Sequence, residues 1–143
     1  MKMGKFGEAI VDYEFVAAQP KNKFTESALV QVARQKYKEK NYTAALASYK
    51  RLSLLGEYKE NLFESEIGQM RTNFELKNYT GAVANAIIAL ESDKADQKLI
   101  TEANLIIAKS NIMLDSPSEA SEYFEKVIKD GSASQAAEAM YLK

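Results

Sequence analysis

Three basic residues recur at nearly even spacing, at Arg34, Arg71 and Lys109. The guanidinium group of arginine is planar, and it pairs with a carboxylate through two parallel hydrogen bonds. A line of such residues would therefore suit an acidic group on a partner. Charged residues on helices usually point into solvent and bind nothing. The three side chains can therefore bind a partner only if the elements that carry them place them together on one surface.

Catalytic chemistry has little support. The chain has no histidine and no cysteine, which removes the usual proton shuttle, thiolate nucleophiles and zinc clusters. Carboxylate pairs such as Glu57 and Glu60 fall on expected surface turns, where no desolvated pocket would tune them for acid–base work. The six glycines are scattered and form no phosphate-binding loop. We expect neither an enzyme nor a bound metal or cofactor.

Composition describes an ordinary globular chain of 143 residues, 46% of them hydrophobic and 27% charged. A net charge of −1 lacks the basic excess that nucleic-acid binding requires. Tyr13, Tyr49, Tyr79 and Phe124 are better explained by packing than by base stacking. Nowhere do about 18 apolar residues follow one another, so direct membrane insertion is not expected.

Two near-identical stretches reveal a repeat: KNYTAAL begins at Lys40 and KNYTGAV begins at Lys77. When they are aligned, four alanines 36, 37 and 38 residues apart share one position: Ala9, Ala45, Ala82 and Ala120. A small residue that recurs in this way indicates a close helix–helix crossing.

Each repeat reads as two helices, because apolar residues recur with helical spacing. Thr43 is expected to cap one second helix, and Ser116, Pro117 and Glu119 form a capping signature for another. Second helices should end near Pro20, at Gly56 and at Asp130–Gly131. Hairpin signals are missing, so the fold class is all-α.

The pattern resembles the tetratricopeptide repeat family. One segment is ESALVQVARQKYKEKNYTAALASYKRL, whose Ala33, Tyr42, Ala45 and Tyr49 match the family's small, aromatic, alanine and aromatic positions. MRTNFELKNYTGAVANAIIAL and AKSNIMLDSPSEASEYFEKVI follow the same frame. The resemblance implies a right-handed α-solenoid of antiparallel helix pairs, with about seven helices.

The repeat boundaries describe one array fragment over residues 1–143. Residues 1–25 form the second half of a repeat, 26–62, 63–100 and 101–136 are full repeats, and 137–143 begin another. The array then opens on a lone helix over residues 6–18 and lacks polar capping units, which indicates a piece of a longer chain. Ile10, Tyr13 and Val16 of that helix could dock on residues 137–143 of a second copy, head to tail.

The resemblance also implies that first helices line a concave groove. The apolar columns there are Val30, Ile67, Leu105 and Tyr37, Phe74, Ile112, and Arg34, Arg71 and Lys109 lie between them. These nine residues are the predicted partner-binding site. Val30 and Ile67 stand where the family's carboxylate clamp has polar residues, so that chaperone-tail activity is not expected. The alternative is a solvated structural face, in which acids of an adjacent repeat, such as Glu64 and Glu102, neutralise the basic line and the apolar columns are core.

A second candidate surface lies on the helix over residues 80–91, which is apolar almost all round. Ile87 and Ile88 could form a convex patch that a partner covers. The interpretation we favour is a tightly packed, alanine-rich helix with one exposed isoleucine.

The predicted function is a protein-interaction scaffold that holds a peptide or a partner helix in its groove. The alternative is a structural spacer within a longer repeat protein. The repeat periods exceed the roughly 34 residues usual in the family. Long repeats of this kind resemble bacterial cell-envelope members, such as outer-membrane assembly lipoproteins and Tol–Pal-associated proteins, which favours a periplasmic or outer-membrane-associated location over the cytoplasm.

Overall fold

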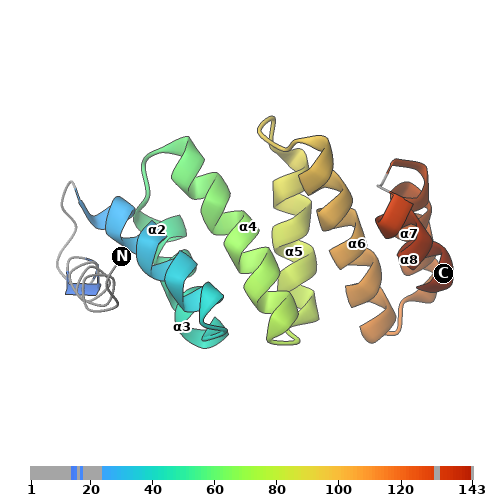
Figure 1. The fold of residues 1–143 in the computed structure, drawn as a ribbon, viewed down its shortest axis with the longest axis horizontal. Coiled ribbons are helices and arrows are strands. Elements are labelled where there is room, and N and C mark those ends of the chain that lie inside the picture. The colour runs from blue at the N-terminus through green and yellow to red at the C-terminus, as the bar shows by residue number, and fades with distance from the viewer. Residues whose placement is uncertain (1–13, 16, 18–23, 131–132, 143) are drawn as a thin grey trace. The chain divides into compact units, whose positions relative to one another are not determined.

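The structure is a computed structural model that describes residues 14, 15, 17, 24–130 and 133–142. These residues form helices and contain no strand, which confirms the all-α prediction (Figure 1). The helices are α2 (Thr25–Lys38), α3 (Tyr42–Leu55), α4 (Lys59–Glu75), α5 (Tyr79–Glu91), α6 (Gln97–Met113), α7 (Pro117–Asp130) and α8 (Ala133–Leu142). None of the described helices has both the length and the apolar character that crossing a bilayer requires.

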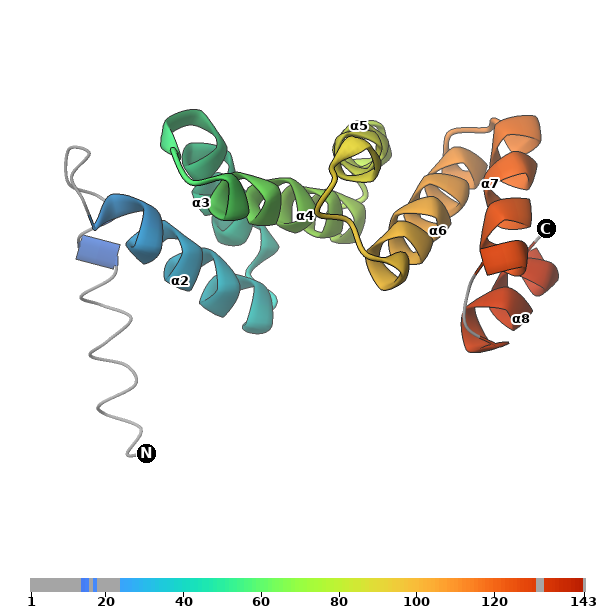
Figure 2. The ribbon, with the colours of Figure 1, turned by 90° about the horizontal axis from the view of Figure 1, so that it is seen from above.

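The chain divides into two compact units, residues 1–72 and 73–143. In unit 1, α2 packs on α3, and most of α4 also belongs to this unit. In unit 2, α5 packs on α6, and α7 packs against both α6 and α8 (Figure 2). Of the predicted helix over residues 6–18, the structure describes residues 14, 15 and 17, which are helical; Ala9 and the stop signals at Pro20 and Gly131 lie outside the described residues.

The repeated KNYT stretch builds the turns that precede α3 and α5. Lys40 and Lys77 have φ values of 64°, in the left-handed region, and Asp115 has 59° at the equivalent turn. The N–H of the residue after each one donates to a carbonyl five residues back, with all three hydrogen bonds 2.8 Å long. This is the hydrogen bond of a Schellman motif, in which the left-handed residue turns the chain and ends the helix.

Asparagine, and not threonine, caps the helix that follows this turn. The side chain of Asn41 accepts a hydrogen bond from the N–H of Ala44, and that of Asn78 accepts one from Gly81. The prediction that Thr43 is the cap was therefore wrong, since it already lies in the first turn of α3. The predicted start of α7 at Pro117 and end of α3 before Gly56 are both confirmed.

The recurring alanines lie where two helices cross closely. Ala45, Ala82 and Ala120 have no solvent exposure. In unit 1, Ala45 packs with Ala33 and Tyr49; in unit 2, Ala120 belongs to a core cluster that also contains Phe124. A larger side chain at these positions would push the helix pair apart.

A buried carboxylate places the start of α4 beside α2. Glu26, which is 8% exposed, accepts hydrogen bonds from the backbone N–H of Tyr58 at 3.3 Å and from Nδ2 of Asn61 at 3.2 Å. Gly56 lies against the same carboxylate, where an added Cβ would be 3.2 Å from Oε1. The loop between α3 and α4 is thus held by a side chain of α2.

Candidate functional site

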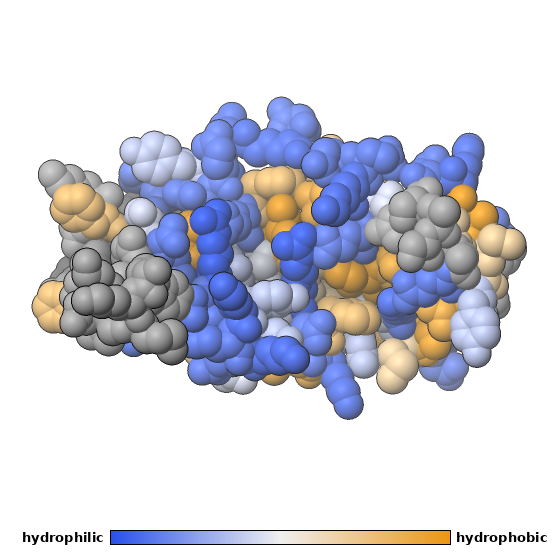
Figure 3. Space-filling view, in the orientation of Figure 1, coloured by the Kyte–Doolittle hydropathy of each residue, from blue (hydrophilic) through white to orange (hydrophobic). Residues whose placement is uncertain are grey.

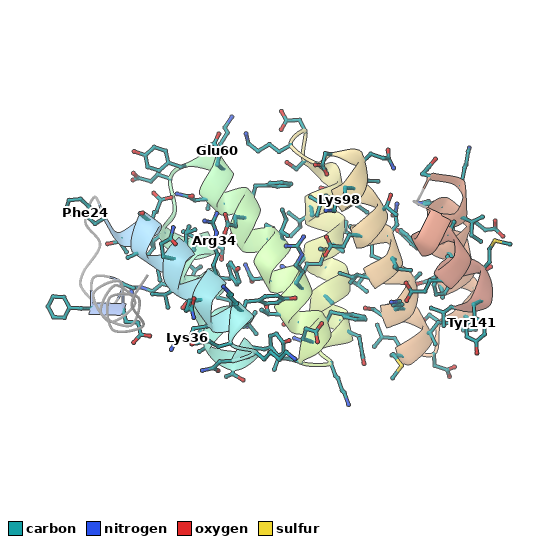
Figure 4. The ribbon with its side chains drawn as sticks, in the orientation of Figure 1. Phe24, Arg34, Lys36, Glu60, Lys98 and Tyr141 are labelled. Carbon is teal, nitrogen blue, oxygen red and sulfur yellow. The ribbon has the colours of Figure 1, made fainter. Side chains whose placement is uncertain are left out.

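Unit 1 contains a pocket of about 430 Å³ between α2, α3 and α4. Arg34 and Tyr37 come from α2 and Tyr49 from α3; one face of α4 supplies the remaining residues. These are Glu60, Phe63, Glu64, Ile67, Gly68 and Arg71. Arg34 projects from α2 toward α4 and reaches the rim (Figure 4).

Tyr49 forms the floor of this unit 1 pocket. It is 5% exposed, and its ring lies directly on Gly68, where an added Cβ would be only 2.3 Å from Cζ. The pKa of Tyr49 is raised to about 12, chiefly by burial; the charge of Glu64 contributes to the rise, whereas Arg34 and Arg71 oppose it. The phenol therefore stays protonated across the physiological range.

The rim of the unit 1 pocket carries an ion pair between two successive first helices. Nε of Arg34 donates to Oε2 of Glu64 at 2.5 Å, and Nη2 donates to Oε1 of the same carboxylate. These hydrogen bonds raise the pKa of Arg34, which therefore remains a cation. The side chains are 55% and 26% exposed, so the pair contributes at most about 1 kcal/mol.

Unit 2 contains a second pocket, of about 380 Å³. Its rim again holds an ion pair between first helices, with Nζ of Lys109 on α6 2.5 Å from Oε1 of Glu138 on α8. The floor is Phe124 of α7, which is 1% exposed. The remaining lining is mostly apolar and consists of Phe74, Tyr79, Ile112, Met113 and Leu142.

The two pockets are built from equivalent positions of the repeat. Each cation is the ninth residue of its predicted repeat, each floor aromatic the 24th, and each acid the second residue of the repeat that follows. The equivalent pairs are Arg34 and Lys109, Tyr37 and Ile112, Tyr49 and Phe124, Glu64 and Glu138, and Gly68 and Leu142. One pocket design therefore occurs once in each unit.

The two copies differ in polarity. In unit 1 the floor is a tyrosine and a second arginine joins the lining, whereas in unit 2 the floor is a phenylalanine with a methionine beside it. The space-filling view agrees, since the face shown is largely hydrophilic over α2 and α4 and more hydrophobic over α5 and α6 (Figure 3).

Seven of the nine predicted site residues line one of these pockets. They are Arg34, Tyr37, Ile67 and Arg71 in unit 1, and Phe74, Lys109 and Ile112 in unit 2. Val30 and Leu105 do not, because they are 5% and 9% exposed and belong to the apolar cores of their units. Placing these two residues in the groove was wrong, and at both positions the core interpretation holds.

The charge-neutralising alternative is borne out at Arg34 and at Lys109. Arg34 is paired with Glu64 and Lys109 with Glu138, in each case an acid from the following first helix. Glu138 was not among the expected partners, although its place as second residue of a repeat matches that of Glu64 and was visible in the sequence.

Several lining residues were overlooked as well, among them Tyr49, Phe124 and Glu60. Tyr49 and Phe124 were assigned to packing alone, but each also forms a pocket floor. Glu60 was placed on a surface turn, whereas it lies in the first turn of α4 and lines the unit 1 pocket.

On α5, both Ile87 and Ile88 are exposed, by 40% and 49%. The favoured interpretation, with a single exposed isoleucine, was therefore wrong. Ala82, Ala86 and Ala89 form the buried face of α5 instead, which leaves both isoleucines toward solvent.

Comparison with known proteins identifies no relative of this chain. No family model matches the chain, and neither a curated protein nor a solved structure matches it.

Proposed function

We propose that this chain is a protein-interaction scaffold that binds a peptide or a partner helix at the pockets between successive first helices. The observation that carries the proposal is the recurrence of one pocket, with its floor aromatic and its rim ion pair, in both units. A site that recurs with the repeat suits a linear partner, which presents side chains at intervals along its own chain.

The polarity of the linings supports a peptide. Each pocket combines aromatic and aliphatic side chains with a few charged groups, the mixture found where proteins bind organic ligands and side chains. At the unit 1 rim, an acidic group of the partner would compete with Glu64 for Arg34. The displaced Glu64 would stay on the protein and return to water, so the exchange replaces one exposed ion pair with another.

The second candidate is the structural spacer, and the ion pairs favour it. Arg34 and Lys109 already have carboxylate partners within the chain, so neither cation requires an external ligand. In this interpretation the pairs join consecutive repeats, and the hollows result from how the helices stack.

Charge reversal distinguishes the two candidates. The test variant is Arg34→Glu/Arg71→Glu/Lys109→Glu. The matched control is Lys50→Glu/Lys98→Glu/Lys129→Glu, which makes the same change in net charge at three exposed positions outside both pockets. Each protein is used to capture partners from source-cell lysate that has been separated into cytosol and envelope, and circular dichroism confirms equal helicity.

A protein that binds the wild type and the control but not the test variant supports the scaffold, and the fraction that supplies it gives the compartment. If all three proteins capture the same set, the pockets do not bind partners and the spacer becomes the leading interpretation.

A further inference from the structure

The lining of the unit 2 pocket exposes several large apolar side chains to solvent. Ile112 is 46% exposed, Met113 60% and Leu142 38%, and all three line the pocket above Phe124. Apolar surface left in water carries a free-energy cost that grows with its area. Exposed apolar groups around one concave site are characteristic of a binding site, whereas single exposed residues are ordinary.

The charges at this pocket compensate each other. Lys109 and Glu138 are 2.5 Å apart, and they are the charged groups among the residues that line the pocket. A charged ligand would lose hydration there without gaining an unpaired counter-charge. A neutral group therefore matches the pocket best.

The pocket is also formed before anything binds. Phe124 is 1% exposed and belongs to the unit 2 core with Ala120 and Val127, so the floor cannot move without disturbing that core. A rigid floor lowers the conformational entropy that a ligand must lose, and methionine at the mouth can adapt to the shape of a side chain.

We infer that the unit 2 pocket is the anchor site for a large uncharged side chain, such as leucine or phenylalanine, on a partner peptide. This inference rests on the proposed function and specifies which pocket binds which kind of side chain of the partner. The unit 1 pocket, with Tyr49 and two arginines in its lining, supplies polar contacts, whereas Ile112, Met113 and Phe124 supply the apolar anchor. The occupant is a peptide side chain because the pocket is one copy of a repeated site.

The chain supplies a matched control for this inference. Ile87 and Ile88 on α5 are, like Ile112 and Met113, two adjacent exposed apolar residues of unit 2, but they line neither pocket. Ile112→Ser/Met113→Ser and Ile87→Ser/Ile88→Ser thus remove similar exposed apolar groups from two places. Because all four side chains are exposed, both variants should fold as the wild type does, which circular dichroism checks.

The experiment selects binders to the full chain from a phage-displayed library of random peptides. Synthetic copies of the selected peptides are then titrated against the wild type and both serine variants by fluorescence polarisation. We expect peptides with a leucine or phenylalanine whose replacement by alanine weakens binding. The Ile112→Ser/Met113→Ser variant should bind them about tenfold or more weakly, and the Ile87→Ser/Ile88→Ser variant as the wild type does.

Other outcomes overturn the inference in distinguishable ways. Peptides that bind the Ile112→Ser/Met113→Ser variant normally but need Arg34 and Arg71 would overturn it while leaving the proposed function intact. Loss of binding in the Ile87→Ser/Ile88→Ser variant instead would move the anchor to α5. A library without any binder to the wild type would overturn both proposals.

Discussion

Replacing Gly68 with alanine tests the closest contact in the unit 1 pocket. Gly68 lies inside α4, where alanine is ordinarily more favourable than glycine by about 1 kcal/mol. The added carbon, however, would lie 2.3, 2.4 and 2.5 Å from Cζ, Cε1 and Cε2 of Tyr49. Since Tyr49 is 5% exposed, its ring has little room to withdraw, and overpacking of this kind costs roughly 1–3 kcal/mol.

We therefore expect Gly68→Ala to lower the free energy of unfolding, by up to about 2 kcal/mol once the gain in helix propensity is subtracted. In a Tyr49→Ala background the ring is absent, so the same substitution should raise the free energy of unfolding by about 1 kcal/mol. Urea denaturation of the four proteins, followed by circular dichroism, completes a double-mutant cycle with a coupling energy of roughly 1–3 kcal/mol.

The Tyr49→Phe background is the control for this cycle. Phenylalanine keeps the ring carbons that meet the new methyl group, so Gly68→Ala should remain destabilising there. If Gly68→Ala stabilises all three backgrounds equally, the ring of Tyr49 does not lie on Gly68, and the account of the pocket floor is wrong.

Substitutions at Ser110, Lys77 and Tyr49 test other features. Ser110 is fully buried, and its hydroxyl has no hydrogen-bond partner within the described part of the chain, so Ser110→Ala should raise the free energy of unfolding by about 1 kcal/mol in urea; a clear decrease would show that the hydroxyl is bonded. Lys77 has a φ of 64°, so Lys77→Gly should stabilise by up to about 1 kcal/mol and Lys77→Val should destabilise; the reverse order in thermal unfolding would contradict the left-handed turn. Tyrosine ionises near pH 10 in the unfolded chain, whereas the pKa of Tyr49 in the folded chain is about 12. The contribution of the neutral phenol is thus complete below about pH 10 and lost as the pH rises to about 12, so the difference in unfolding free energy between wild type and Tyr49→Phe should fall by about 2–3 kcal/mol over that window; a constant difference in urea titrations at each pH would refute the raised pKa.

The helices could be predicted from local signals because similar turn and helix signals recur in each repeat. The KNYT stretch marks both turns where it occurs, and helix periodicity extends from it in both directions. The cap was misplaced because Thr43 and Asn41 are both good capping residues. What decides between them is the left-handed turn at Lys40, since it sets the residue from which the next helix starts.

The pockets were only partly predictable, because burial depends on the residue that a neighbouring helix presents. Val30, Ile67 and Leu105 share a frame position, yet only Ile67 lines a pocket. Ile67 is followed by Gly68, on which Tyr49 lies, whereas Val30 and Leu105 are covered by core side chains. The residues at one frame position of the first helices do not show which side chains of the neighbouring helices cover them.

The scaffold and spacer interpretations make opposite demands on Ile112 and Met113. In a spacer these two side chains serve no purpose in water, so serine at both positions would leave stability unchanged or slightly improved and would cost no interaction. In a scaffold they are the walls of an anchor site, and the same change costs affinity without a cost in stability. Because both residues are already largely exposed, stability and binding can be separated here, which is not possible at the buried floor residue Phe124. The mouth of the unit 2 pocket is therefore the place where the two functions can be told apart.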